Sequence, residues 1–461
     1  MKVDVLNGRV NKTFFTLLFS AIASTIVSTI YSTVDMICVG HYSGPDGAAA
    51  IACINPLWAL MFAFGVLAGV GGAVMMSNRR GAKDHHAANE YFTVSTVMSL
   101  ICAVILFVTY TFFTEPLLVL FGAEGRVLEL AVDYMQAMCF SVPTFTMCAC
   151  LSTFMRNDGE AVIPTVATII GGVLNIILDI LLVFTFDMGI RGAGLATGIG
   201  QFVAFLIILS YFFSKKCNLK LTKTTDLSGV LSRIVTVGCS AFLIEITSGI
   251  TSAVHNIVIM ENLSSAHLAV YGTAATVLIM FYCLFNGIGT ALQPMVATAF
   301  GAGNVKRIKD TLKLSFITAA AMGLFFFALC EIFPDTILKI YMDVDESVLA
   351  VGPRIVRLYS CALPIMGLCL VCNYFFQSTL HRSASIIISM LRGLVFPVLL
   401  VLTLPLMFGY DYLWLGTPIG EIITCAVAIL MLIPMVKRLN SNKEQENSEE
   451  IQENEKNYTL S

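Results

Sequence analysis

Two aspartates interrupt long apolar stretches in the first half of the chain. Asp35 lies in TIYSTVDMICVG (29–40), and Asp179 lies in GGVLNIILDILLVF (171–184). Asn175 precedes Asp179 by about one helical turn, so the two side chains project from one face of a helix. Ionisable groups inside a membrane helix cost about 2.5 to 3.5 kcal/mol on insertion scales and usually mark functional sites. The two carboxyl groups could bind a cation or hold a proton.

The elements that carry these acids are predicted to be transmembrane helices. Of 461 residues, 57% are hydrophobic and 12% are charged, whereas about 25% of the residues in a typical soluble domain are charged. Apolar runs of about 20 residues, the length of a membrane-spanning helix, recur along the whole chain. The alternating pattern of a membrane β-barrel is missing. We therefore predict an all-α integral membrane protein with twelve transmembrane helices, at about 13–40, 48–77, 91–113, 128–154, 161–186, 191–213, 229–259, 266–300, 310–333, 350–377, 384–408 and 413–436.

An internal repeat relates the two halves of the chain. At an offset of 220 residues, GIRGAGLATGIGQF (189–202) aligns with GYDYLWLGTPIGEI (409–422). The repeat predicts two homologous six-helix lobes, and because six is even, both lobes cross the membrane in the same sense. Their pseudo-two-fold axis then runs along the membrane normal, as in transporters with parallel repeats. The predicted parts are an N-terminal lobe (1–213), a basic cytoplasmic linker (214–228), a C-terminal lobe (229–437) and a disordered cytoplasmic tail (438–461).

Basic residues indicate the orientation of the chain. Most of them fall in loops on the side of the N-terminus, whereas the opposite loops hold only Arg126, Arg191 and Lys339, with Arg354 and Arg357 at a helix entrance. The positive-inside rule then places both termini in the cytoplasm. The first apolar run is too long for the core of a cleavable signal peptide, so we expect none.

The predicted topology places the polar residues of the first lobe at similar depth. Asp35 lies five residues before the outer end of span 1, about 8 Å deep at about 1.5 Å per residue. Asp179 lies about seven residues before the end of span 5, and Thr197 about six residues after the start of span 6. If these spans are neighbours, Asp35, Asn175, Asp179 and Thr197 converge. Their hard oxygen atoms suit a small cation such as sodium, and a pair of buried carboxyl groups equally suits a proton. Polar contacts between helices are the simpler alternative.

Four stretches carry a family resemblance that spans nearly the whole chain. They are YSTVDMICVG (31–40), GAVMMSNRRGAKDHHAANEYF (72–92), the run from FMRNDGEAVIP to GLATGIGQ (154–201) and QPMVATAFGAGNVKRIK (293–309). These stretches resemble the multidrug and toxic compound extrusion (MATE) family of bacterial inner-membrane transporters. The resemblance implies a two-lobed antiporter that exports organic cations, drugs or other amphipathic compounds in exchange for sodium or protons.

The resemblance also implies a site and a set of partners. In the family, the cation site of the first lobe is built from an aspartate, an asparagine, a second aspartate and a threonine, which correspond here to Asp35, Asn175, Asp179 and Thr197. These residues would be the metal ligands if the ion is sodium. We expect no other cofactor, no enzymatic activity and no nucleic acid partner. The expected protein is a monomer in the bacterial cytoplasmic (inner) membrane that contacts lipid and small organic cations.

Two departures from the family pattern limit the mechanism. Family members often carry a proline in the first half of span 1, where it is proposed to let the helix bend, but this chain has none between Thr13 and Gly40. Some members place their main carboxylate in span 10, but CALPIMGLCLVCNYFFQ (361–377) contains no acid. We therefore expect neither a proline-dependent bend nor a mechanism based on an acid in span 10.

Further candidates lie in the second lobe and beside Asp35. Glu245 resembles the span-7 glutamate that binds cations in some family members, and it could form a second cation or substrate site or a structural pair with His255 or Arg392. His255 corresponds to Asp35 at the 220-residue offset, so it is a candidate proton-responsive group, with a helix contact as the alternative. Arg392 is expected to neutralise a carboxylate or to face the cavity. Tyr31, one turn before Asp35, is expected beside the substrate cavity.

Two other functions were weighed against drug antiport. A flippase of lipid-linked saccharides would need a cavity rich in arginine to hold pyrophosphate, whereas only Arg392 lies deep in a span. An enzyme would need a nucleophile and a base, and no such pair is apparent. The chain lacks the GxxxxGK[ST] phosphate-binding loop, so active transport would draw on an ion gradient, and a passive channel remains open. Most of the fourteen cysteines lie in apolar spans, where we expect them to pack as small apolar side chains.

Overall fold

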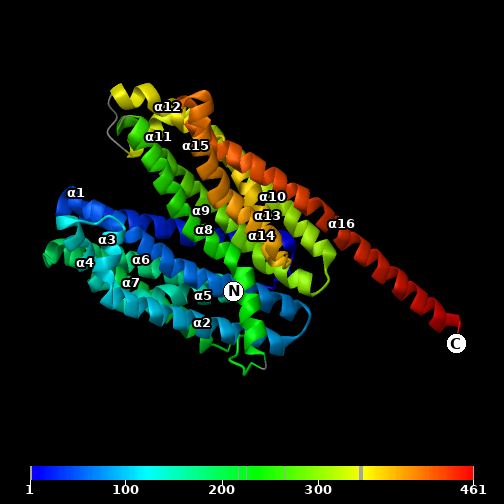
Figure 1. Ribbon diagram of the computed structural model, residues 1–461. Coiled ribbons are helices and arrows are strands. Elements are labelled where there is room, and N and C mark those ends of the chain that lie inside the picture. The colour runs from blue at the N-terminus through cyan, green and yellow to red at the C-terminus, as the bar shows by residue number, and fades with distance from the viewer. Residues whose placement is uncertain (1–2, 216, 225, 264, 342–345, 460–461) are drawn as a thin grey trace.

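The computed structural model describes residues 3–215, 217–224, 226–263, 265–341 and 346–459, and these are almost entirely helical (Figure 1). The elements of the first lobe are α1 (Val10–Gly81), α2 (His85–Phe112), α3 (Thr114–Leu120), α4 (Gly125–Met138), η1 (Cys139–Ser141), α5 (Val142–Asn157), α6 (Val162–Asp179), η2 (Ile180–Thr185) and α7 (Gly189–Phe212). Those of the second lobe are α8 (Leu227–Asn262), α9 (Ser265–Gly301), α10 (Val305–Ile332), α11 (Pro334–Tyr341), α12 (Glu346–Ser360), α13 (Leu363–Ser378), α14 (Arg382–Met390), η3 (Leu391–Val395), α15 (Phe396–Phe408), η4 (Tyr410–Leu415) and α16 (Gly416–Thr459).

Twelve spans of the described chain are long and apolar enough to cross a membrane, as the sequence predicts. A bilayer offers no water to backbone groups, so helices that satisfy their own hydrogen bonds are the stable solution for such apolar runs. The first two predicted spans are joined in α1, which breaks at Gly44 with φ +66° and ψ −154°. This left-handed backbone is one that glycine adopts without steric cost. Up to Gly44 the first span is an uninterrupted helix.

The two-lobe architecture is confirmed, and its helix boundaries follow the internal repeat. Helices α1 and α9 end at Gly81 and Gly301, and helices α2 and α10 begin at His85 and Val305, in each case at the 220-residue offset. In Figure 1 the blue and cyan helices of the first lobe lie below the yellow and orange helices of the second. We call the end of the bundle at which α2, α8 and α10 begin the linker end. Helices α3 and α4 lie at the opposite end of the first lobe, and α11 and α12 at that of the second.

The lobes meet through α1, α8 and α9. This contact extends from the linker end toward the middle of the bundle. A Cβ atom added at Gly71 would lie 2.1 Å from the carbonyl oxygen of Ile234, and one at Gly301 would lie 1.8 Å from that of Asn78. Asn78 also donates a hydrogen bond to the carbonyl of Ser378 (3.1 Å). Glycine therefore permits backbone-to-backbone contact between the lobes, in the way that small residues allow close approach of membrane helices.

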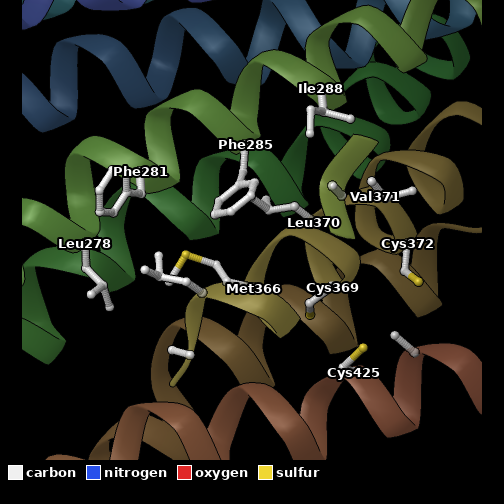
Figure 2. Packing of buried hydrophobic residues seen from close by; sticks show 14 of the residues in the cluster. Leu278, Phe281, Phe285, Ile288, Met366, Cys369, Leu370, Val371, Cys372 and Cys425 are labelled. Atoms are coloured by element: carbon white, nitrogen blue, oxygen red, sulfur yellow. The ribbon is translucent and has the colours of Figure 1, made fainter. Parts of the chain in front are cut away.

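The core of the second lobe is an apolar layer between α9, α13 and α16. Figure 2 shows Phe281 and Phe285 of α9 facing Met366 and Leu370 of α13. Three cysteines complete this layer, and each is buried: Cys369, Cys372 and Cys425. All fourteen cysteines of the chain are free thiols. The buried cysteines of this layer pack as small apolar groups, as the sequence predicts.

The C-terminal tail continues the last helix, and the predicted disorder from residue 438 stays a prediction. Helix α16 continues to Thr459 and projects away from the bundle (Figure 1), whereas the sequence predicts a disordered segment from residue 438. The tail holds six Glu, two Lys and two Gln, which are good helix formers, and five Asn, which is a poorer one. Local propensity thus favours continuation of the last span as helix.

Candidate functional site

The four residues predicted to converge in the first lobe do lie together, on α1, α6 and α7. Less than a twentieth of each residue is exposed: Asp35 2%, Asn175 2%, Asp179 0% and Thr197 4%. Asn175 Nδ2 donates hydrogen bonds to Asp179 Oδ1 (3.5 Å) and to Thr197 Oγ1 (3.2 Å). Asn175 thus links an acid on its own helix to a hydroxyl on the next.

A fifth residue, Tyr134 of α4, completes the network. Its hydroxyl donates to Asp35 Oδ2 (3.0 Å) and lies 3.1 Å from Thr197 Oγ1. Its side chain is fully buried and lies beside Trp58, with ring centroids 6.2 Å apart. Asp35 is therefore connected to Asp179 through Tyr134, Thr197 and Asn175. We call these five residues the carboxylate network.

The sequence interpretation missed Tyr134, although a signal for it was present. Tyr134 lies about six residues after the predicted start of span 4, and Thr197 lies about six residues after the predicted start of span 6. Both spans run inward in the predicted topology, so the depth argument places the two hydroxyl groups at the same height. What the sequence could not show is that α4 packs against α7.

Close helix packing brings α6 and α7 together at this site. A Cβ atom at Gly171 would lie 2.7 Å from the carbonyl oxygen of Gly200, and one at Gly200 would lie 2.7 Å from that of Gly171. Asn175 is one turn from Gly171, and Thr197 is about one turn from Gly200. The glycine contact therefore sets the two polar side chains within hydrogen-bond reach. A π-helical segment, η2, begins directly after Asp179, and such segments are frequent at functional sites.

Three buried oxygen atoms of the network have no hydrogen-bond partner. They are Asp35 Oδ1, Asn175 Oδ1 and Asp179 Oδ2. Buried polar atoms are nearly always paired, and an unpaired one costs about 1 to 3 kcal/mol. Two carboxylates and an amide carbonyl are hard oxygen donors of the kind that Na⁺-like cations prefer. The donor set therefore fits a small cation, and either carboxylate could accept a proton instead.

Tyr31 lies one turn before Asp35 on α1, and its half-buried ring packs against α6. A Cβ atom at Gly172 would lie 2.8 Å from Tyr31 Cδ1. The ring therefore covers the small residue that precedes Asn175 by three positions. This contact places Tyr31 beside the carboxylate network.

The second lobe does not repeat the acid pair. His255 is buried, its Nδ1 lies 2.8 Å from the carbonyl oxygen of Thr251, and its ring stacks on Tyr271 with a centroid distance of 5.3 Å. Thr417, the counterpart of Thr197, lies near Tyr359. The counterpart of Asp179 at the same offset is Leu399. The two lobes are thus chemically unequal at corresponding places.

The deep arginine of the second lobe is paired with a carboxylate. Arg392 Nε lies 2.7 Å from Glu421 Oε1, and its guanidinium lies 5.0 Å from the centre of the Tyr282 ring. Both charged side chains are largely buried. Glu245 lies half-buried on α8. Arg392 therefore neutralises Glu421, and this ion pair joins η3 to α16.

Comparison with known proteins agrees with this architecture. A family model described as MatE matches residues 20–181 and 240–403, two stretches whose starts differ by the 220-residue offset. The multidrug export protein MepA of Staphylococcus saprophyticus is 28% identical over 403 residues, which cover 86% of this chain and 87% of that protein. MepA of Staphylococcus haemolyticus is 26% identical over 414 residues, which cover 88% of this chain and 89% of that protein.

Solved structures share the fold at low sequence identity. A MOP superfamily transporter from Pyrococcus furiosus superposes with a TM-score of 0.88 and 22% identity, over 95% of this chain and 98% of that one. An outward-facing multidrug resistance MATE family transporter superposes with a TM-score of 0.86 and 23% identity, over the same 95% and 98%. This likeness establishes the twelve-helix, two-lobe fold.

Proposed function

Because the chain belongs to the MatE family, we propose that it is an antiporter that exports organic cations, drugs or other amphipathic compounds in exchange for sodium or protons. The observation that carries this proposal is the buried carboxylate network with its three unpartnered oxygen atoms. The similarity to two proteins named as multidrug export proteins supports the substrate class. The protein acts as a monomer in the bacterial cytoplasmic membrane, with both termini in the cytoplasm, as the basic loops favour.

In the proposed cycle, Asp35 and Asp179 take up the driving ion from the outer side. The ion neutralises negative charge in a site from which water is excluded, where charge interactions are strong. Asn175 and Thr197 supply further oxygen atoms, while Tyr134 holds Asp35 in place. Since α1, α6 and α7 all contribute, ion binding changes how these helices pack and weakens the hold on a cationic substrate. Each positive charge that moves inward gains about 2.3 kcal/mol per 100 mV of membrane potential.

The second lobe has a supporting part in this proposal. Glu245 attracts a cationic substrate or contributes to a second cation site, whereas His255 serves as a packed ring against Tyr271. The flippase alternative is not favoured, because the deep arginine that it would use for a pyrophosphate group is already paired with Glu421. Tyr31 borders the substrate path next to Asp35.

Ion-driven efflux from proteoliposomes tests this proposal. A cationic dye is loaded, and its efflux is measured under separately imposed sodium and proton gradients. We expect Asp35→Asn and Asp179→Asn to abolish efflux driven by the coupling ion. Wild-type rates in both variants would contradict the proposal.

A matched pair of threonine variants separates the site from the fold. Thr197→Val removes a hydroxyl from the carboxylate network, and Thr417→Val removes the corresponding hydroxyl from the second lobe. We expect the first change to raise the ion concentration needed for half-maximal efflux and the second to leave it unchanged. Equal effects of the two substitutions would show that the oxygen ligands are not confined to the first lobe.

A further inference from the structure

A lateral pocket lies away from the carboxylate network, at the seam between the two lobes. It has a volume of about 640 Å³, which is within the range of about 300 to 1,000 Å³ for small-molecule sites. Its walls come from α2, from the linker and from the start of α8. The apolar lining residues are Val94, Val97, Met98, Ile101, Cys102, Leu221, Leu227 and Leu231.

The lining of the pocket on α2 is about as long as one membrane leaflet is thick. Its lining on α2 extends from Thr93 to Cys102, which is about 14 Å at about 1.5 Å per residue and about half of a hydrocarbon core of about 30 Å. Several wall residues are exposed, among them Val97 at 49% and Ile101 at 55%. In a membrane protein such a surface faces acyl chains, so the pocket opens toward lipid.

The linker closes the pocket at the membrane surface. The backbone N–H of Thr222 donates to Thr93 Oγ1 (2.9 Å), and that of Lys220 donates to Asn89 Oδ1 (3.3 Å). These bonds hold the linker along the first turns of α2. The linker segment, with Leu221, Thr222, Lys223 and Thr224, thus forms a largely polar roof over an apolar pocket.

The roof presents groups that suit an anion. The hydroxyl oxygen of Thr224 is buried and has no hydrogen-bond partner, and the side chain of Lys223 next to it is exposed. Both residues line the pocket. One oxygen of the nearby Asp226 carboxylate, Oδ1, accepts a hydrogen bond from the N–H of Gly229 (2.9 Å) at the start of α8. A basic side chain and a hydroxyl without a hydrogen-bond partner therefore both line the linker side of an apolar pocket.

We propose that this pocket binds an anionic phospholipid of the leaflet on the linker side. One acyl chain lies between α2 and α8, and the phosphate group contacts Lys223 and Thr224. Because the walls belong to both lobes, a bound lipid stabilises the arrangement of the lobes seen here over arrangements that open the pocket. This site is separate from the proposed ion and drug sites, so its test does not depend on transport.

Native mass spectrometry of the full chain provides the first test. The detergent-solubilised protein is titrated with phosphatidylglycerol and with phosphatidylcholine of the same acyl chains. We expect one phosphatidylglycerol to bind about fivefold more tightly, which is the contribution of one basic side chain near an anionic headgroup. Lys223→Gln should remove this preference, and Lys309→Gln, which changes an exposed lysine at the same end of the second lobe, should retain it.

Fluorescence quenching by lipids with brominated acyl chains provides a second test that locates the lipid. The two native tryptophans, Trp58 and Trp414, are replaced by Phe. A single tryptophan is then introduced by Val97→Trp in the pocket, or by Ile317→Trp as a control. Ile317 is the counterpart of Val97 at the 220-residue offset, lies equally far along its helix, and is 56% exposed. From the quenching of tryptophan fluorescence, we expect brominated phosphatidylglycerol to be enriched about fivefold over brominated phosphatidylcholine next to the tryptophan of Val97→Trp. We expect no such enrichment next to the tryptophan of Ile317→Trp.

Three results would overturn the proposal. The first is equal binding of the two lipids to the unsubstituted protein. The second is an equal loss of preference in Lys223→Gln and Lys309→Gln, which would indicate a general surface charge effect. The third is displacement of the lipid from the Val97→Trp site by the organic cation tetraphenylphosphonium, which would make the pocket a substrate site.

Discussion

The close contact between α1 and α8 predicts that Gly71→Ala disrupts the joint between the lobes. The added Cβ atom would lie 2.1 Å from the carbonyl oxygen of Ile234 and 3.1 Å from the backbone nitrogen of Gly238. Real Cβ atoms stay at least 3.0 Å from such atoms, so one helix must move away from the other by roughly 1 Å. The obstructing atoms are backbone atoms of a helix, so no side-chain rotation can relieve the clash.

The expected cost is that of overpacking a well-packed contact, about 1 to 3 kcal/mol. This energy lowers the population of the present lobe arrangement by about 5- to 150-fold, at about 1.4 kcal/mol per factor of ten. For a unit of about 150 to 250 residues, a loss of 1 kcal/mol lowers the Tm by about 2 to 4 °C. We therefore expect a Tm about 2 to 12 °C below that of the unsubstituted protein, together with slower efflux.

Intrinsic tryptophan fluorescence follows the unfolding of both lobes, because Trp58 lies in the first lobe and Trp414 in the second. Gly40→Ala is the matched control: it makes the same change in the same helix, where a Cβ atom would meet nothing within 4 Å. The control should keep or slightly raise the Tm, since alanine favours helix over glycine. If Gly71→Ala showed the Tm and the efflux rate of Gly40→Ala, the argument from interlobe contact would be refuted.

Two further predictions concern the polar groups inside the lobes. Tyr134→Phe removes only the hydroxyl that joins Asp35 to Thr197. We expect it to slow ion-driven efflux about tenfold or more, because a hydrogen bond to a charged group contributes about 1.5 to 3 kcal/mol. An unchanged dependence of efflux on ion concentration in proteoliposomes would argue against this role. Arg392→Met leaves Glu421 without its buried partner, and we expect it to destabilise the protein by about 3 to 5 kcal/mol. The double variant Arg392→Met, Glu421→Leu should recover most of this loss in thermal unfolding, and failure to recover would indicate that lost packing, rather than the unpaired charge, is the cause.

The sequence alone determined the twelve spans and the two-lobe repeat. A bilayer core requires apolar helices of a known minimum length, so composition and run length settle the number of elements without reference to packing. The fixed rise of a helix also placed Asp35, Asp179 and Thr197 at one depth. At the C-terminus, a composition poor in apolar residues predicts disorder from residue 438, and α16 runs to Thr459.

Only the tertiary structure decided which side chains meet at that depth. Height along a helix follows from counting residues, but the direction in which a side chain faces its neighbours depends on how whole helices pack. The contact of Gly171 with Gly200 brings Asn175 to Thr197, and the packing of α4 brings Tyr134 to Asp35. The same holds for the lateral pocket, whose walls are more than a hundred residues apart in the sequence. Residues this distant are brought together by contacts between helices. The hydrophobic periodicity within a single span does not predict such contacts.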